Sequence, residues 1–174
     1  MLAALLKPSM RVKSLDAISP LELQTRNIRG LVIDLDNTMT PWNAMEVGPK
    51  VSQWFKSLAE YNIKCCVVSN NNERRVAAVA NALGIPFIHK ATKPRRRAFY
   101  RGMEILGTTV KDTAVIGDQL FTDVLGGNRL GLFTILVLPI SKREWIGTRV
   151  MRLFERMVFW SLDHLEHVGS GKLR

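Results

Sequence analysis

The stretch Gly30-Leu31-Val32-Ile33-Asp34-Leu35-Asp36-Asn37-Thr38 decides the fold of this chain. Its apolar run ends abruptly in two carboxylates, Asp34 and Asp36, followed by the hydroxyl of Thr38. Such a run is typical of a buried strand, and ligands of open α/β sheets bind beyond the carboxyl ends of the strands. Two carboxylates this close repel each other unless a positive group lies beside them. A hard cation such as Mg²⁺, which prefers oxygen ligands, suits that place.

Strand and helix patterns alternate along the chain. Helical patterns begin near Pro20, Pro49, Val76, Pro94 and Thr122, where apolar residues recur at three- and four-residue spacing. Short apolar runs between them predict strands at 31–35, 64–68, 86–88, 114–116 and 133–138. This alternation predicts an α/β fold, a doubly wound three-layer sandwich with a mostly parallel five-stranded sheet.

The chain divides into a domain at residues 1–140, which includes an N-terminal helical lead, and a basic amphipathic helical tail at 141–174. The tail combines an apolar stripe with aromatic and basic side chains, among them Trp145, Arg149 and Arg152. Two interpretations are open and equally weighted. The stripe packs on the domain, or the tail lies on a membrane surface.

Composition limits the class of protein. The net charge of +10 predicts attraction to an acidic partner, whether nucleic acid, anionic lipid or a phosphorylated substrate. Cys65 and Cys66 are adjacent inside an apolar run, which favours two small core residues in a reducing compartment over a disulfide framework. No apolar run has the roughly 18 residues of a membrane span. We therefore expect a cytoplasmic protein, with peripheral attachment to the inner face of the membrane as the alternative.

Polar side chains follow four of the expected strands. Because the carboxyl ends of parallel strands share one edge, these side chains should meet around one crevice. They are Asp34, Asp36, Ser69, Lys93, Asp118 and Asp123. The set suits phosphoryl transfer: a metal neutralises the carboxylates, one carboxylate attacks phosphorus, and another serves as general acid and base. A hydroxyl and an ammonium group would hold the phosphoryl oxygens.

The order of these motifs resembles the haloacid dehalogenase (HAD) superfamily. From about Pro20 to Pro139 the chain is more closely similar to the YqeG-type subfamily IIIA phosphatases, in particular through the segments 68–76 and 117–128. The resemblance implies that Asp34 is the nucleophile and Asp36 the general acid/base. It implies phosphate binding by Ser69 and Lys93, with Asn70 as a further candidate. It also implies a Mg²⁺ site, whose residues are Asp34, the Asp36 backbone carbonyl, Asp118 and, in support, Asp123.

The sequence leaves little room for a cap over the expected site. The segments 37–47 and 89–92 are too short for the cap domain that many HAD enzymes insert there, so an uncapped site and a large or surface-bound substrate are expected. Basic residues from Lys90 to Lys111 lie beside the expected phosphate-binding Lys93, although such a run is often only a solvated helix face. His89 is expected at the surface.

The YqeG-type group is similar to mitochondrial and plant phosphatidylglycerophosphate phosphatases. The leading hypothesis is therefore a peripheral phosphatase that acts on this lipid headgroup during phospholipid synthesis. One alternative is a phosphatase for a soluble phosphomonoester, namely a nucleotide, a sugar phosphate or a nucleic-acid end. The other is a non-enzymatic module that binds RNA or ribosomes through residues 95–101, with Phe99 and Tyr100 as its candidate stacking platforms.

Overall fold

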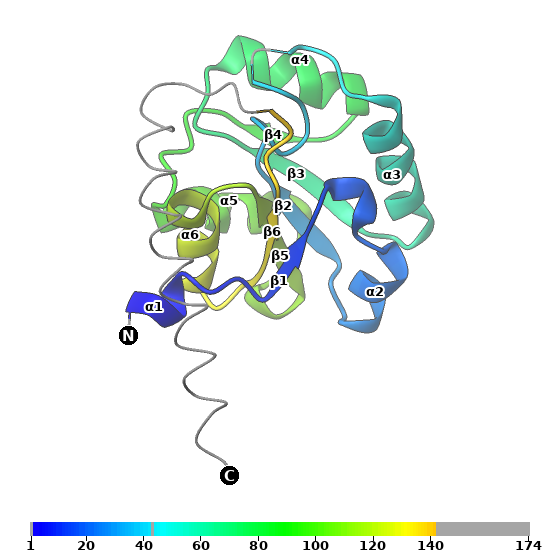
Figure 1. Cartoon of the computed structure of the whole chain (residues 1–174). Helices are drawn as coiled ribbons and strands as arrows, with labels where there is room; N and C mark the ends of the chain where they lie inside the picture. Colours follow the sequence, from blue (N-terminus) through cyan, green and yellow to red (C-terminus); the bar gives the residue numbers. More distant parts are fainter. Residues whose placement is uncertain (1, 43, 142–174) are drawn as a thin grey trace.

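Six parallel strands form one sheet in a computed structural model that describes residues 2–42 and 44–141. Their order across the sheet is β1-β6-β5-β2-β3-β4, and every neighbouring pair is parallel (Figure 1). The strands are β1 (Met10–Val12), β2 (Gly30–Ile33), β3 (Lys64–Val68), β4 (Phe87–Ile88), β5 (Thr113–Gly117) and β6 (Phe133–Val137). The predicted parallel sheet is confirmed, with one strand more than expected.

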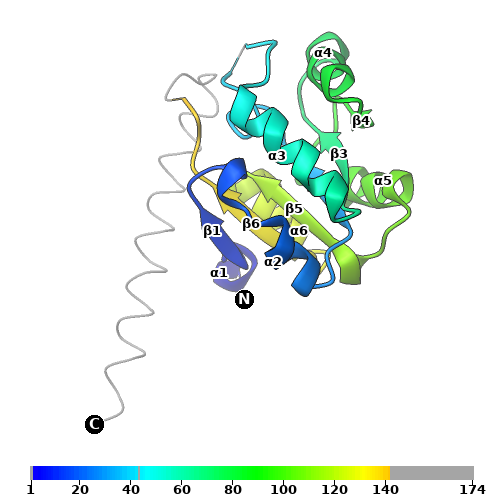
Figure 2. The same ribbon diagram turned by 90° about the vertical axis from the view of Figure 1, so that its right-hand side faces the viewer.

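Helices cover both faces of the sheet. They are α1 (Leu2–Leu5), α2 (Pro20–Thr25), α3 (Pro49–Glu60), α4 (Glu73–Leu83), α5 (Arg96–Leu106) and α6 (Leu125–Asn128), with short helical turns η1 (Leu15–Ala17), η2 (Val110–Asp112) and η3 (Leu120–Val124). Apolar residues of α2, α3 and α4 pack on one face, and those of α5 and η3 pack on the other. Figure 2 shows α3 lying across the first of these faces. The predicted three-layer sandwich is thereby confirmed.

The unexpected strand, β1, is the edge strand beside β6. It is three residues long, its burial alternates between partial and exposed, and it contains Arg11. A strand this short and this polar gives no apolar run that sequence reasoning could detect. Its position is fixed by neighbours distant in sequence, because the Asn128 side chain donates to the carbonyls of Leu5 and Lys7 at 2.8 and 2.9 Å.

The strands alternate between two cores. In β2, Leu31 and Ile33 face the core beneath α3 and α4, whereas Val32 faces the core beneath α5. The two cysteines follow the same rule, because Cys65 belongs to the first core and Cys66 to the second. Both thiols are free and buried, and burial raises the pKa of Cys66 to about 12. They are core residues, as the sequence favoured.

The direction of winding reverses between β2 and β5. The chain runs from β2 through α3 to β3 and through α4 to β4, and then returns through α5 to β5 on the other side of β2. Connections that leave in opposite directions open a crevice beyond the carboxyl ends of the two central strands. The Asp34 N–H donates to the Ile116 carbonyl at 2.8 Å, which ties the two strand ends together at this point.

Between β2 and α3, and between β4 and α5, the described residues contain only short connections and no cap domain. Within the same residues, no helix is long and apolar enough to cross a membrane. Residues 142–174 lie outside the described part of the chain, so the division at residue 140 and the amphipathic tail stay predictions.

Gly117 at the end of β5 supplies the space that the crevice needs. A Cβ built on Gly117 would overlap the carboxyl group of Asp123. We predict that Gly117→Ala lowers the free energy of unfolding by about 1–3 kcal/mol, because the Asp123 side chain has to move within a packed interior. Chemical denaturation monitored by circular dichroism measures the change.

Gly48→Ala is the matched control, because its Cβ would meet nothing within 4 Å. Gly48 is the N-cap of α3, so this control should cost less than about 1 kcal/mol. Equal stability losses for the two variants would contradict the steric role given to Gly117.

Candidate active site

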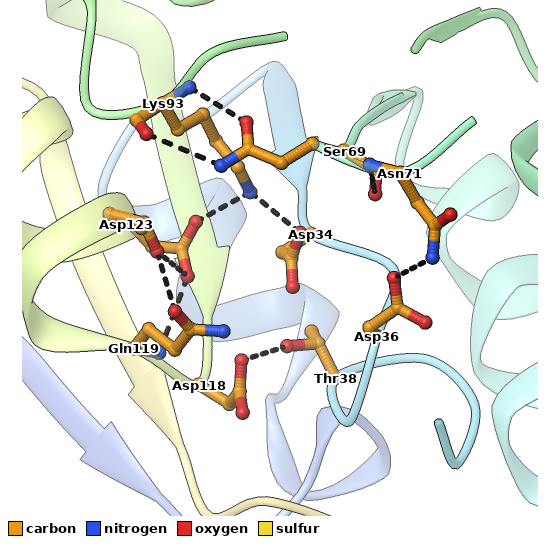
Figure 3. Close-up of polar contacts among 11 residues, drawn as sticks. Asp34, Asp36, Thr38, Ser69, Asn71, Lys93, Asp118, Gln119 and Asp123 are labelled. Carbon is orange, nitrogen blue, oxygen red and sulfur yellow. Dashed lines mark hydrogen bonds and ion pairs between the residues drawn. The ribbon is translucent and has the colours of Figure 1, made fainter. Parts of the chain in front are cut away.

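Lys93 is the centre of the crevice. Its ammonium group lies 2.6 Å from Asp34 Oδ1 and 2.6 Å from Asp123 Oδ1, so one cation joins carboxylates from two different elements (Figure 3). All three side chains are buried. Burial alone lowers the pKa of an ammonium group, but Asp123 and Asp34 outweigh it here and raise the pKa of Lys93, which keeps this side chain charged.

Asparagine 70 fixes the main chain that presents Lys93. The Lys93 N–H donates to Asn70 Oδ1 at 2.7 Å, and Asn70 Nδ2 donates to the Lys93 carbonyl at 3.3 Å. Ser69, directly after β3, accepts a hydrogen bond from the Asn71 N–H at its Oγ, at 3.1 Å. The loop after β3 is therefore attached to the loop after β4. The attachment consists of the two hydrogen bonds between the Asn70 side chain and the Lys93 main chain.

Asp123 reaches the crevice from η3, where the chain turns directly after β5. Its Oδ2 accepts from the Gln119 N–H at 3.3 Å and from the Thr122 hydroxyl at 3.2 Å. Asp118 lies opposite, and the Thr38 hydroxyl donates to its Oδ1 at 3.4 Å (Figure 3). Asp118 and Asp123 both belong to the segment that follows β5. These hydrogen bonds orient their carboxylates toward the end of β2.

Three carboxylates meet closely enough to share a cation. Oxygen atoms of Asp34, Asp118 and Asp123 all lie within 4.8 Å of one another. Lys93 contributes one positive charge against the three negative charges of these ionised groups. The remaining charge of about −2 and the all-oxygen donor set fit a divalent metal ion such as Mg²⁺.

The crowding of carboxylates also affects the pKa of Asp34. Burial raises the pKa of Asp34 to about 7, and the nearby carboxylates of Asp123 and Asp36 add to the rise, while Lys93 opposes it. A carboxyl group in this state is held between its neutral and ionised forms near neutral pH. Additional positive charge in the crevice would favour the ionised form.

Asp36 is held apart from this cluster. It lies two residues after Asp34, yet its Oδ2 accepts from Asn71 Nδ2 at 2.9 Å, on the side of α4 (Figure 3). Its Oδ1 lies 2.8 Å from Nε and 2.7 Å from Nη2 of Arg75, a buried residue in the first turn of α4. The Arg75 guanidinium also donates to the carbonyls of Pro41 and Ala44. We call this arrangement the Arg75 clamp.

The residues expected to meet at the sheet edge do so, except that the Asp36 carboxylate turns toward Asn71 and Arg75. Asp34, Asp118, Asp123 and Lys93 form one cluster, with Ser69 buried at the end of the adjacent β3. Asn71 and Arg75 lie within the segment 68–76 that carries the family resemblance, but the sequence assigned neither of them a role. An arginine in the first turn of a helix is ordinarily solvated, so the sequence carried no signal of its burial against Asp36.

His89 is only partly exposed, and its Nε2 lies 3.9 Å from Glu73, outside the carboxylate cluster. Phe99, one of the only two candidate stacking platforms for the RNA-binding alternative, is fully buried under the sheet. It lies on the inward face of the amphipathic helix α5, so it offers no exposed ring for a base. Tyr100, by contrast, is exposed.

A parallel α/β sheet that gathers carboxylates and a lysine at its winding reversal defines the chain as a phosphatase of the HAD type. The particular family follows from comparison with known proteins. The chain belongs to the family described as mitochondrial PGP phosphatase, whose model matches residues 2–140.

Among curated relatives, the probable phosphatase YqeG of Bacillus subtilis is 44% identical over 168 residues, which are 97% of this chain and 98% of that protein. Phosphatidylglycerophosphate phosphatase 1 of Arabidopsis thaliana is 28% identical over 84% of this chain, which spans 45% of that protein. Among solved structures, the cobalt-bound deoxy-D-mannose-octulosonate 8-phosphate phosphatase of Haemophilus influenzae has the same fold, with a TM-score of 0.54, 21% identity, and coverage of 66% of this chain and 70% of that one.

The crowded carboxylates predict that Asp34 destabilises the metal-free protein above neutral pH. Its pKa is raised from 3.8 to about 7 on folding, so the folded state binds the proton more tightly and stability is lost as pH rises through this interval. At pH 8 without metal, Asp34→Asn should therefore be more stable than wild type, by on the order of 1–3 kcal/mol. At pH 5 the difference should shrink, as thermal unfolding over this range will measure.

Asp16→Asn, which removes an exposed carboxylate from η1, is the control and should shift the unfolding temperature little. Addition of Mg²⁺ should raise the unfolding temperature of wild type more than that of Asp34→Asn. A variant that is less stable than wild type at pH 8 would show that Asp34 is not electrostatically strained.

The Arg75 clamp predicts a functional coupling between Arg75 and Asp36. Arg75→Met should lower kcat at least about tenfold, because the Asp36 carboxylate loses its principal anchor. In an Asp36→Asn background the same substitution should cost less than about threefold. Phosphate release by the two single variants and the double variant measures this coupling, and equal losses in both backgrounds would assign Arg75 to the 41–44 loop alone.

Proposed function

We propose that this phosphatase removes the terminal phosphate of phosphatidylglycerophosphate in a Mg²⁺-dependent reaction, through an aspartyl-phosphate on Asp34. The observation that carries the proposal is the cluster of Asp34, Asp118 and Asp123 around one buried lysine, at the edge where α/β sheets bind their ligands. Membership of the family described as mitochondrial PGP phosphatase supports the choice of substrate.

Asp34, Asp118 and the backbone carbonyl of Asp36 would hold the metal, with Asp123 in support. Bound Mg²⁺ supplies positive charge that draws the carboxylates and the phosphoryl oxygens together. The Lys93 ammonium group and the Ser69 hydroxyl bind the phosphoryl oxygens and orient the phosphorus toward Asp34. Asn70 contributes by fixing the Lys93 main chain, through its two hydrogen bonds to that residue.

In the first step a carboxylate oxygen of Asp34 forms a bond to phosphorus, and the bond from phosphorus to the lipid oxygen breaks. Asp36 donates a proton to the leaving oxygen, which departs as the alcohol phosphatidylglycerol. In the second step Asp36 accepts a proton from water, the water oxygen attacks phosphorus, and Asp34 leaves as a free carboxylate. In this structure Asp36 is held by Asn71 and Arg75, so the proposed role requires its carboxyl group to turn toward the reacting oxygens.

The surroundings of the crevice suit a substrate that is presented at a membrane. The described residues contain no cap over it. Exposed apolar side chains lie in the segments that follow β2 and β6, at the same sheet edge, and they are Met45, Leu138 and Ile140. Exposed basic side chains follow β4 and begin α5, and they are Lys90, Arg95, Arg96, Arg97 and Arg101. Apolar and basic groups together favour contact with an anionic lipid surface.

The sequence also allowed two other functions. An RNA-binding role through residues 95–101 is weakened, because Phe99 is buried and leaves Tyr100 as the single aromatic side chain exposed in this segment. A soluble phosphomonoester stays the competing substrate, and an assay on lipid and soluble substrates in parallel separates it from phosphatidylglycerophosphate.

We expect purified protein to release phosphate from phosphatidylglycerophosphate in mixed micelles with Mg²⁺ and to lose this activity on chelation of the metal. Asp34→Asn should reduce the rate at least about a thousandfold, because the attacking carboxylate is removed. The Asp16→Asn control should retain activity, since Asp16 is an exposed residue of η1 and is not part of the carboxylate cluster. Efficient turnover of soluble phosphates with none of the lipid would refute the lipid assignment and leave a phosphatase.

A further inference from the structure

A second hollow lies directly behind Asp36, outside the carboxylate cluster. It measures about 410 Å³ and is lined by Met45, Asn71, Asn72, Arg74 and Arg75. Two of these residues, Asn71 and Arg75, are the ones that hold the Asp36 carboxylate. The hollow and the Asp36 carboxylate therefore share two neighbours, Asn71 and Arg75.

The residues that line this hollow include two arginines and no acidic side chain. Arg75 is buried, and its guanidinium is occupied by Asp36 and by the carbonyls of Pro41 and Ala44. Arg74 is exposed and, among the described residues, makes no hydrogen bond or ion pair. The nearest acid along the helix, Glu73, is exposed and its carboxylate lies 3.9 Å from His89. The hollow thus has a guanidinium group available for an anion.

Asn72 adds a neutral donor at the same place. Its Oδ1 accepts from the Arg75 N–H at 3.1 Å, as the N-cap of α4. This bond fixes the side-chain amide, whose Nδ2 has no partner among the described residues and remains a donor. Arg74 and Asn72 together offer the charged and neutral N–H groups that recognise a phosphate oxygen, and Met45 offers an apolar wall for a carbon chain.

We infer that this hollow binds a second anionic group of the substrate, a phosphodiester separated by a short carbon chain from the phosphomonoester at Asp34. Arg74 is the principal contact of this subsite, with Asn72 as its neutral partner. The inference rests on the proposed function. Phosphatidylglycerophosphate has this chemistry, because one glycerol carries a phosphodiester at one end and a phosphomonoester at the other. The subsite would distinguish it from simple phosphomonoesters, which lack the diester.

The test compares two soluble substrates that share the phosphomonoester end: glycerol 3-phosphate, and glycerophosphoglycerophosphate, the deacylated headgroup, which adds a phosphodiester and a terminal glycerol. Neither requires a membrane, so lipid contact does not enter the comparison. The quantity measured is the ratio of kcat/KM for the diester-bearing substrate to that for glycerol 3-phosphate. We expect wild type to favour the diester-bearing substrate and Arg74→Gln to lower the ratio about tenfold, the size of one charged hydrogen bond at an open site.

Arg74→Lys should fall between wild type and Arg74→Gln, because it keeps the charge and loses the planar donor pair. Arg129→Gln is the matched control: it removes the same charge from an exposed residue at the end of α6 and should leave the ratio unchanged. A ratio that is unchanged in Arg74→Gln overturns the subsite and leaves the phosphatase proposal intact. A wild-type protein that hydrolyses phosphatidylglycerophosphate in mixed micelles but neither soluble substrate also overturns the subsite and leaves the phosphatase proposal intact. Failure on all three substrates with Mg²⁺ overturns the proposed function, and the subsite with it.

Discussion

The organisation of this crevice follows from the confinement of three carboxylates beside one buried ammonium group. Asp34, Asp118 and Asp123 approach one another within 4.8 Å, and Lys93 bridges two of them. Their repulsion is imposed by topology, because the reversal of winding between β2 and β5 brings both strand ends to the same place. The absence of a side chain at Gly117 then lets Asp123 fit against β5. The result is a repulsive charge distribution that a divalent cation can neutralise.

Two cations give the two neighbouring acids of β2 different environments. Asp34 is buried and faces Lys93, whereas Asp36 is partly exposed and faces Arg75 on α4. The divergence is possible because β2 ends at Ile33, so the following residues no longer obey strand geometry. The roles proposed for Asp34 and Asp36 require different protonation behaviour, and different surroundings are the means by which proteins separate such groups. The Arg75 clamp also joins Asp36 to the 41–44 loop, so the acid and the rim are positioned by one guanidinium.

Much of this arrangement could be predicted from sequence, for a reason that is visible in β2. Its apolar run predicts a buried parallel strand. The carboxyl ends of parallel strands lie at the same edge of the sheet, and the residues that follow those ends are Asp34, Ser69, Lys93 and Asp118. Those inferences need only local patterns and one topological rule. The edge strand β1 and the Arg75 clamp needed contacts between residues far apart in sequence. Arg75 has the same local context as the exposed Arg74 beside it, and only the packing of α4 against the loop after β2 distinguishes them.

This difference between adjacent arginines bears on substrate selection. A cap encloses a small substrate and contacts its whole surface, but residues 2–42 and 44–141 contain no cap, and among them the crevice is bordered by the loops that follow the strands. Selectivity then has to come from groups on that rim that touch the part of the substrate beyond the reacting phosphate. Arg75 is committed to Asp36 and cannot serve this purpose without disturbing the proposed acid/base group. Arg74 is exposed and lines the hollow beside Asn71 and Arg75, so the substrate contact proposed for it would leave the hydrogen bonds of Asp36 in place.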